Sequence, residues 1–495
     1  MLPPCIRQSV AFVLFVVLAG TSLAAQPKPL EFHVTFDKSV TDKPFTGRVY
    51  VMLTKNNLKV PPGGPNWFAP EPFFAKDVKD WKPGEPLVLG ADALSCPMPL
   101  KEVKAGPWSI VAIMDFDRGM SFAQSEGNGY SQPVRVDLAP PADSPPFALK
   151  IDQVYKERVF PENERVKLVE IESKLLSDFH KRPIKLRAGV ALPKSFGVQP
   201  EKKYPVLYEI PGFSGNHYGA FGQRTELDGV EFLYVVLDPN CRLGHHVFAD
   251  SANNGPCGKA LIEELIPAIE KKYRGIGTPA ARFLTGHSSG GWSSLWLQVA
   301  YPDFFGGVWS TAPDPVDFRD FQMIDLYKPG TNMFTDAEGK PRPIARNGTR
   351  PVLFYKGFSD MEEVMGHGGQ LRSFEAVFSP RGADGQPLKL WDRKTGAIDT
   401  AVAKTWEPYD IRLVLERNWK TLGPKLAGKI HVYMGDADTF YLEGATKLLQ
   451  KSLKDLGSDA VVELFPGKNH GSLMTAELRQ RIAREMADQF RKSQK

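Results

Sequence analysis

The apolar and polar positions of the chain follow two different patterns, one before and one after a proline-rich segment. Between residues 27 and 137, short β-prone runs alternate with Pro and Gly residues, as in antiparallel strands joined by turns. The clearest of these runs are residues 31–36, 47–53 and 108–114. We therefore predict a small N-terminal domain built as a β-sandwich.

The proline-rich segment itself, residues 138–146, reads Leu-Ala-Pro-Pro-Ala-Asp-Ser-Pro-Pro. Its prolines fix φ and remove backbone N–H donors, which suits a linker better than a strand or a helix. The sequence therefore predicts a boundary here between the N-terminal domain and a second domain over residues 147–495.

In this second domain, apolar β-rich runs occur singly, and several are followed by helix-like segments. That alternation is typical of an α/β fold with a largely parallel sheet covered by helices. Residues 260–273, for example, place their apolar side chains on one helical face and their charges on the other. The predicted strands are residues 188–192, 205–210, 232–237, 282–285, 307–310, 430–434 and 461–465.

The stretch from about residue 314 to 425 is long and mixed, with turn signals at residues 381–385 and several aromatic residues. We interpret it as an insertion into the second domain that shapes one wall of a substrate cleft.

Charge adds little to this picture. The chain has 62 basic and 57 acidic residues, a net charge of +5, and no basic block. Nucleic acids and anionic membranes would require Lys and Arg gathered on one face. We therefore exclude nucleic acid as a partner and keep small neutral or weakly charged substrates.

The first 25 residues have the pattern of a signal peptide. A single charge at Arg7 precedes an apolar run over residues 10–19 and small residues at 22–25. No later segment has the roughly 20 apolar residues that a transmembrane helix requires. We predict a cleaved signal, no integral membrane segment in the mature chain, and a periplasmic or secreted protein. The alternative is an uncleaved membrane anchor.

Cleavage would remove Cys5 and leave Cys96, Cys241 and Cys257, so at most one intramolecular disulfide can form. Cys241 and Cys257 share a loop-rich stretch and are the favoured pair in an oxidising compartment. Three buried thiols are the alternative. Without a CxxC motif or a Cys/His cluster, we predict no structural metal.

The strongest chemical signal is Gly286-His287-Ser288-Ser289-Gly290. This G-x-S-x-G motif follows a predicted strand and precedes a helix-like segment, where flanking glycines let the chain turn sharply and expose the serine hydroxyl. Ser288 is the predicted nucleophile. Ser289 is the rival hydroxyl but is out of frame with the glycines, and its backbone N–H is a predicted oxyanion donor. The alternative is a glycine turn without a catalytic hydroxyl.

An acid and a base follow the nucleophile in the order that this motif requires. Asp438 comes after the strand at residues 430–434, and His470 lies in a loop after the last strand. We predict Asp438 as the acid and His470 as the base. Asp436 is read as a turn residue, and Asp314 or Asp317 is the alternative source of the acid.

A second oxyanion donor is expected in the turn after an early strand, at residues 210–215. We assign it to the backbone N–H of Phe213, with Ser214 as the alternative. His245 and His246 lack an acidic or cysteine partner at metal-ligand spacing. We keep them as cleft-lining residues and predict neither a metal nor a cofactor.

These motifs resemble the putative-esterase family of the α/β-hydrolase superfamily, which includes esterase D and the siderophore and feruloyl esterases. The resemblance covers roughly residues 180–480 and implies the α/β-hydrolase fold, with Ser288, Asp438 and His470 as the triad. The long insertion and the N-terminal β domain depart from esterase D. The matching segments are residues 208–213, 264–267, 273–274, 286–291, 435–438 and 469–470.

We therefore expect an exported serine hydrolase that cleaves carboxylic esters through an acyl-enzyme intermediate. A small-molecule or polysaccharide-linked ester, such as a feruloyl or acetyl group, is the favoured substrate class. A serine peptidase and an acyltransferase on the same fold are the rivals. A third alternative is a non-catalytic carbohydrate-binding protein in which residues 27–137 form the binding part.

Overall fold

The computed structural model of the chain describes residue 1, residues 30–138 and residues 146–494. Apart from Met1, the predicted signal peptide lies outside the described residues, as does most of the predicted linker. Within the described ranges, no helix combines the length and the apolar character needed to cross a bilayer.

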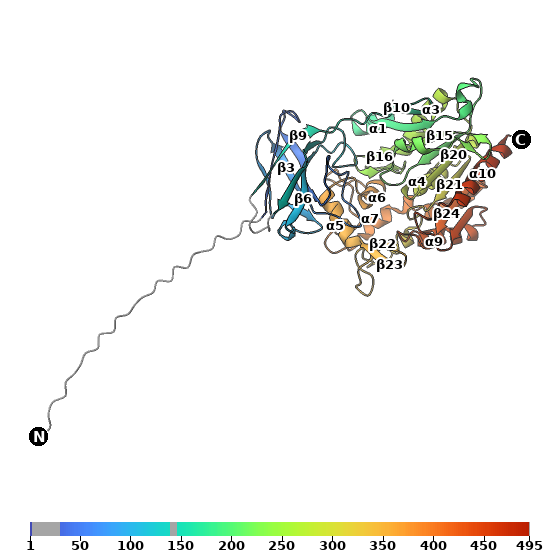
Figure 1. Ribbon diagram of the computed structural model, residues 1–495. Helices are drawn as coiled ribbons and strands as arrows, with labels where there is room; N and C mark the ends of the chain where they lie inside the picture. The colour runs from blue at the N-terminus through green and yellow to red at the C-terminus, as the bar shows by residue number, and fades with distance from the viewer. Residues whose placement is uncertain (2–29, 139–145, 495) are drawn as a thin grey trace.

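The N-terminal part of the chain forms one nine-stranded sheet in the order β4-β1-β9-β7-β6-β2-β3-β5, with β8 paired to β6 (Figure 1). The strands are β1 (Phe32–Phe36), β2 (Phe45–Thr54), β3 (Phe73–Trp81), β4 (Leu87–Leu89), β5 (Leu94–Cys96), β6 (Gly106–Asp115), β7 (Gly129–Ser131), β8 (Val134–Leu138) and β9 (Phe147–Val154).

This sheet curls onto itself, so that strands far apart in its order face each other across one core, as in the predicted β-sandwich. Phe32 of β1 and Phe74 of β3 are far apart in the strand order, yet their ring centroids lie 6.1 Å apart in one enclosed apolar core. The boundary predicted between the two domains is wrong. Strand β9 follows the proline-rich segment and pairs in parallel with β1, so the sheet extends to Val154. The prolines therefore connect two strands of one sheet.

The rest of the chain forms an eight-stranded sheet in the order β10-β11-β15-β12-β20-β21-β24-β25. The strands from β15 to β25 are parallel, whereas β10 and β11 are antiparallel. The strands are β10 (Val166–Glu172), β11 (Lys185–Ala191), β12 (Val206–Ile210), β15 (Leu233–Leu237), β20 (Arg282–His287), β21 (Gly307–Thr311), β24 (Ile430–Gly435) and β25 (Val461–Phe465).

Short hairpins decorate this sheet. They are β13 (Glu226–Leu227) with β14 (Val230–Glu231), β16 (Asn240–Cys241) with β17 (Gly244–His245), β18 (Asp250–Ser251) with β19 (Gly255–Pro256), and β22 (Pro343–Asn347) with β23 (Arg350–Phe354).

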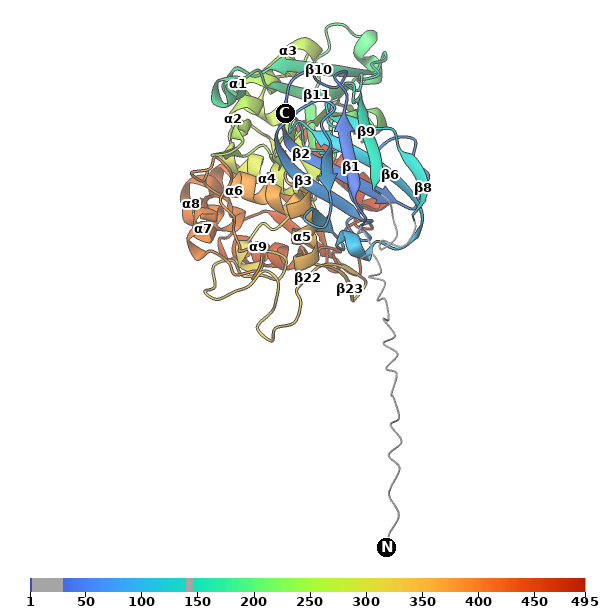
Figure 2. The ribbon, with the colours of Figure 1, turned by 90° about the vertical axis from the view of Figure 1, so that its left-hand side faces the viewer.

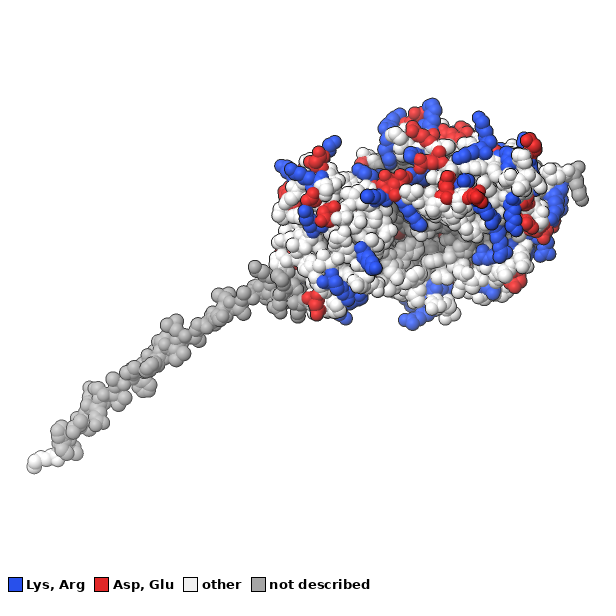
Figure 3. Space-filling view, turned by 45° about the horizontal axis from the view of Figure 1, so that its top comes forward, with Lys and Arg blue, Asp and Glu red and all other residues white. Residues whose placement is uncertain are grey.

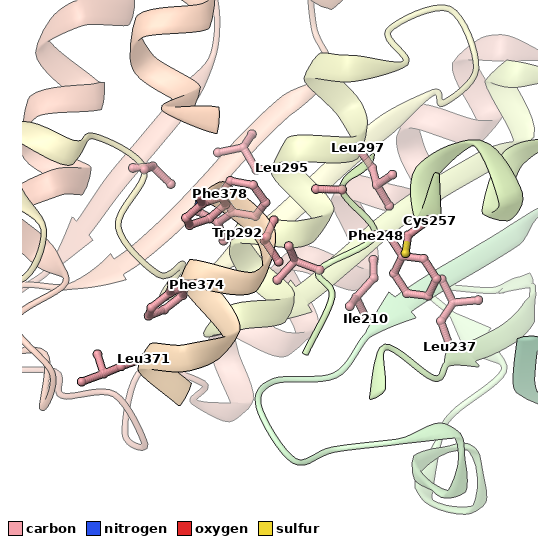
Figure 4. Packing of buried hydrophobic residues seen from close by; sticks show 14 of the residues in the cluster. Ile210, Leu237, Phe248, Cys257, Trp292, Leu295, Leu297, Leu371, Phe374 and Phe378 are labelled. Carbon is pink, nitrogen blue, oxygen red and sulfur yellow. The ribbon is translucent and has the colours of Figure 1, made fainter. Parts of the chain in front are cut away.

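Helices cover both faces of the sheet, as predicted for an α/β fold. On β12, Tyr208 and Ile210 pack into the larger core, while Leu207 packs on the opposite face with α10. Figure 4 shows side chains of α4 and α6 meeting in the larger core. The helices are α1 (Lys174–His180), α2 (Cys257–Ala260), α3 (Ile266–Tyr273), α4 (Ser289–Ala300), α5 (Tyr355–Met365), α6 (Gln370–Phe378), α7 (Thr400–Thr405), α8 (Ile411–Leu426), α9 (Glu443–Asp455) and α10 (Ala476–Ser493).

The predicted helix at residues 260–273 is interrupted. Helices α2 and α3 are joined by a π-helical turn, Leu261–Leu265, just before Pro267. Proline has no N–H for the regular i→i−4 bond, which accounts for the local change of hydrogen bonding.

The segment at 314–425 contains β22, β23 and α5–α7, but also most of α8. Parallel strands β21 and β24 require a crossover, and α8 supplies it by packing on α4. The final part of the predicted insertion therefore belongs to the α/β framework.

The two sheets belong to one packed body (Figure 2). Tyr50 and Met52 of β2 point away from the curled core and join the core of the α/β part. Tyr50 Oη donates to the carbonyl of Met365 at 2.5 Å, and Arg48 donates to the carbonyls of Glu363 and Val364. The end of α5 is therefore capped by the N-terminal sheet.

Candidate active site

The predicted site residues all follow strands at one edge of the parallel sheet. Ile210, at the end of β12, pairs with Gly286 of β20, and His287 pairs with Thr311 of β21. Since parallel strands end at a common edge, the loops that carry Phe213, Ser288 and Asp438 converge there.

The glycines around Ser288 are required by close packing of the chain. A Cβ on Gly286 would lie 2.1 Å from the carbonyl oxygen of Gly290, and one on Gly290 would lie 1.9 Å from that of Ile210. Ser288 itself has φ 61° and ψ −125° at the start of α4. This is a strained conformation for a non-glycine residue, and such strain concentrates at functional sites. Ser288 therefore has the backbone of a nucleophile elbow.

The hydroxyl of Ser289, the alternative nucleophile, is already hydrogen-bonded to a buried acid. It is buried, and its Oγ donates to Asp314 Oδ2 at 2.6 Å. Gln370 of α6 donates to the same pair of oxygens. Burial raises the pKa of Asp314 to about 6, against the opposing effect of its hydrogen bond from Ser289. Sequence reasoning missed this buried network, because Gln370 comes from a distant helix.

The predicted acid and base lie in direct contact. His470 Nδ1 and Asp438 Oδ2 are 2.8 Å apart, and Asp438 is fully buried. The other carboxylate oxygen accepts from the backbone N–H of Phe440 at 2.8 Å. The imidazole therefore carries its proton on Nδ1 and leaves Nε2 free to accept one. In the described part of the chain, Nε2 makes no hydrogen bond, to Ser288 or to any other residue.

The remaining acids have structural roles. Asp436 accepts from the backbone N–H of Gly467 at 2.7 Å, as a turn residue does. Asp317 is buried between Arg319 and Arg412. Neither Asp317 nor Asp314 contacts His470 through a hydrogen bond, so Asp438 is the acid that the geometry favours among the candidates.

The loop after β12 lies against the elbow. A Cβ on Gly212 would be 3.1 Å from the carbonyl oxygen of His287 and 3.4 Å from Ser288 Cβ. Among the described residues, no acceptor takes the backbone N–H of Phe213 or Ser289. Both predicted oxyanion donors are therefore available beside Ser288.

His245 supports this loop. Its Nδ1 accepts from the backbone N–H of Val247, and its Nε2 donates to the carbonyl of Pro211 at 2.9 Å. Burial lowers the pKa of His245 to about 4. The neutral ring therefore positions the loop that carries Phe213.

Aromatic side chains surround the site, and two come from the N-terminal sheet. In the loop between β2 and β3, Trp67 lies 5.5 Å from Phe213 and 4.9 Å from Phe358 of α5, between ring centroids. Its neighbour Phe68 lies 6.4 Å from Phe440, whose ring meets His470 edge-on at 5.0 Å. Nothing in the Pro- and Gly-rich sequence of this loop indicates that contact.

The cysteines differ from the favoured prediction. Cys96, Cys241 and Cys257 are free thiols. Cys241 and Cys257 both donate to Asn254, at 3.5 and 3.4 Å. The pairing predicted from their shared loop is therefore not formed, because both thiols turn toward this asparagine.

A family comparison adds to this geometry. The family model described as putative esterase matches residues 181–456, more than half of the chain. The chain belongs to this family. It is a carboxylic ester hydrolase, and its α/β-hydrolase fold agrees with the expectation drawn from sequence.

Other comparisons are more distant. No curated protein matches this sequence. Among solved structures, a ferulic acid esterase has 16% identity and a TM-score of 0.40, with coverage of 66% of this chain and 99% of that one. An S-formylglutathione hydrolase from Agrobacterium tumefaciens has 14% identity and a TM-score of 0.41, with 66% and 95% covered. Dipeptidyl peptidase 4 from Porphyromonas gingivalis has 14% identity and a TM-score of 0.37, with 84% and 46% covered.

Proposed function

We propose that this member of the putative-esterase family is an exported serine esterase with Ser288, Asp438 and His470 as its triad. The observation that carries the proposal is the 2.8 Å contact between His470 Nδ1 and buried Asp438, beside the strained elbow at Ser288. The ring of His287 lies 4.6 Å from that of His470, between centroids. The hydrogen bond from Ser288 to His470 Nε2 is part of the proposal and is expected to form with bound substrate, since catalytic hydrogen bonds are often long before substrate binds.

The reaction proceeds in two steps. Ser288 Oγ attacks the ester carbon while His470 Nε2 takes the serine proton, and the amides of Phe213 and Ser289 bind the oxyanion. The C–O bond to the alcohol then breaks, and His470 gives its proton to that alcohol. Water attacks the acyl-enzyme with His470 again as base, and cleavage of the bond to Ser288 releases the acid.

Aromatic side chains support a bulky, aryl-containing ester as substrate. Phe68 is 48% exposed, although it lies beside Phe440 and thus near His470. An exposed ring next to the base offers a face for an aromatic acyl or alcohol group. A feruloyl-type ester on polysaccharide fits this surface better than an acetyl ester alone.

Export is the other part of the proposal, and it rests on the pattern of residues 1–25. N-terminal sequencing of the protein recovered from the periplasm or medium of a bacterial host should begin near Gln26. A chain that retains residues 1–25 would contradict this part only.

The test of the triad compares two adjacent serines. Ser288→Ala should lower kcat on p-nitrophenyl acetate by on the order of 10⁴- to 10⁶-fold, because it removes the nucleophile. Ser289→Ala keeps both Ser288 and the amide at 289, and should retain most of the activity. Comparable activity of Ser288→Ala and the wild type would refute the proposal. Faster turnover of peptide amides than of matched esters would favour the peptidase instead.

A further inference from the structure

A cavity outside the proposed catalytic site lies where three parts of the chain meet. Its volume is about 860 Å³, within the range of small-molecule sites. The loop after β6 supplies Asp117 and Arg118, the α/β part supplies residues between 180 and 257, and the segment after α6 supplies Arg381. Neither Ser288, His470 nor Phe213 lines it, so the cavity is distinct from the proposed catalytic site.

Three guanidinium groups around this cavity lack a carboxylate partner. Among the described residues, Arg118, Arg182 and Arg381 form no ion pair, whereas Arg242 and Arg187 are paired with acids. All three side chains are exposed, and Arg381 donates to the carbonyl of Asn253 at 3.1 Å. Arg182 and Arg381 also contribute, after burial, to the lowered pKa of His180. Six basic side chains and three acids, Asp117, Glu126 and Asp238, line the cavity, so positive charge is in excess there. Over the face seen in Figure 3, acids and bases are interspersed.

Deeper in the cavity, neutral amides have unmet hydrogen-bonding capacity. Asn253 and Asn254 are 2% and 5% exposed, and both line the cavity. Asn253 Oδ1, Asn254 Nδ2 and Asn240 Oδ1 find no partner among the described residues. Buried polar atoms of this kind cost free energy unless water or a ligand satisfies them.

These groups select one ligand chemistry. Guanidinium groups recognise carboxylates through paired hydrogen bonds. The unpartnered amide oxygens of Asn240 and Asn253 can accept from hydroxyl groups, and the amide nitrogen of Asn254 can donate, once these buried atoms turn toward the cavity. We propose that the cavity is a binding site for a small polyhydroxylated carboxylic acid, of the sugar-acid class.

Two residues that line the cavity hydrogen-bond to the loop that carries the predicted oxyanion donor Phe213. Asn240 Nδ2 donates to the carbonyl of Gly215 at 2.9 Å, two residues after Phe213. Asp238, at the edge of the cavity, holds His217 Nδ1 at 2.7 Å at the end of the same loop. A ligand that binds Asn240 therefore contacts a side chain that holds this loop in place.

The test uses the purified full-length protein and calorimetric titration with galacturonate, its neutral counterpart galactose, and inorganic phosphate. Galacturonate should bind at least tenfold more tightly than the other two. The double variant R182A/R381A should lose about tenfold or more in affinity, since each charge-assisted contact contributes at least that order of effect. Arg350 is exposed, does not line the cavity and forms no ion pair in the described chain, so R350A is the matched control and should bind normally.

Rising salt should weaken galacturonate binding to the wild type, which keeps the test valid even if the double variant folds poorly. Equal affinity for galacturonate and galactose, or for galacturonate and phosphate, would overturn the proposal. So would galacturonate competing with p-nitrophenyl acetate, since the ligand would then occupy the catalytic cleft. The Ser288→Ala variant should bind galacturonate as tightly as the wild type does. This result would hold whether or not Ser288 is the nucleophile, so the cavity proposal and the esterase proposal can fail separately.

Discussion

At the scale of single residues, the backbone at Ser288 depends on two neighbouring glycines whose positions leave no room for a side chain. Gly286 lets β20 lie close to α4, and Gly290 lets α4 lie close to the end of β12, because a Cβ at either position would collide with a backbone carbonyl oxygen. The hydroxyl of Ser289 is held by Asp314, and Asp438 orients His470. Ser289 and His470 thus hydrogen-bond to different acids, so substitutions should separate the roles of Asp314 and Asp438.

Asp438→Asn tests the orienting acid. An amide in place of the carboxylate favours the wrong tautomer of His470, so kcat should fall by about 10³- to 10⁴-fold. Steady-state kinetics on p-nitrophenyl acetate measure this. Asp436→Asn, two residues earlier in the same motif, keeps the acceptor for Gly467 and should leave kcat nearly unchanged. Equal losses in both variants would contradict the assignment of the acid.

Asp314 should make stability depend on pH. Its folded pKa of about 6 exceeds the ordinary value of 3.8 for this side chain, so the folded state binds the proton more tightly than the unfolded state. Its contribution favours folding at low pH and is lost as pH rises from about 4 to 6. The loss amounts to at most about 3 kcal/mol, since one pKa unit corresponds to about 1.4 kcal/mol.

Asp314→Asn removes this titration and keeps an acceptor for Ser289. Urea unfolding at pH 4 and pH 7 should show the variant gaining stability relative to the wild type at the higher pH. A difference in unfolding free energy that stays the same at both pH values would contradict the raised pKa.

At the scale of elements, the predicted strands of the α/β sheet were accessible from sequence because they are nearly continuous apolar runs. Strand β10 was not, because Glu170 and Glu172 give it an exposed, charged face at the sheet edge. The order of the proposed triad residues could also be predicted from the sequence, since each of them follows a strand. The aromatic contacts of Trp67 and Phe68 were not, because a loop without periodicity carries no signal for partners hundreds of residues away.

That loop should set substrate choice. W67A/F68A removes the aromatic wall near Phe213 and Phe440, so kcat/KM for aryl-acyl esters should fall about three- to tenfold relative to acetyl esters, the range for one or two aromatic pairs. Val60 is exposed in the same loop, and V60A is the matched control. Equal losses on aryl and acetyl esters would indicate a general loss of stability instead of a substrate-binding role.

At the scale of the whole molecule, the N-terminal sheet is part of the hydrolase body. Tyr50, Met52 and Phe73 are buried in the same core as residues of the α/β part, and a buried side chain of this size contributes roughly 1.5–3 kcal/mol. This shared core could not be predicted from the sequence, because the proline-rich segment suggested a linker between two domains. In the structure, the strands on either side of that segment, β8 and β9, belong to one sheet. An independent carbohydrate-binding domain would not share such a core.

Scanning calorimetry of the mature chain should therefore show one cooperative unfolding transition. Arg48→Ala, which removes the donors to the end of α5, should lower the midpoint of that single transition. Two separate transitions, with only one shifted by the substitution, would show that the N-terminal sheet unfolds independently.

The most direct measurement for the central claim is labelling with a fluorophosphonate, followed by peptide mapping. Such a probe phosphonylates a serine only when a base activates its hydroxyl. We expect one adduct, on Ser288. It should be absent in Ser288→Ala, and it should form much more slowly in Asp438→Asn. An adduct on Ser289 or elsewhere, or full ester turnover without any adduct on Ser288, would contradict it.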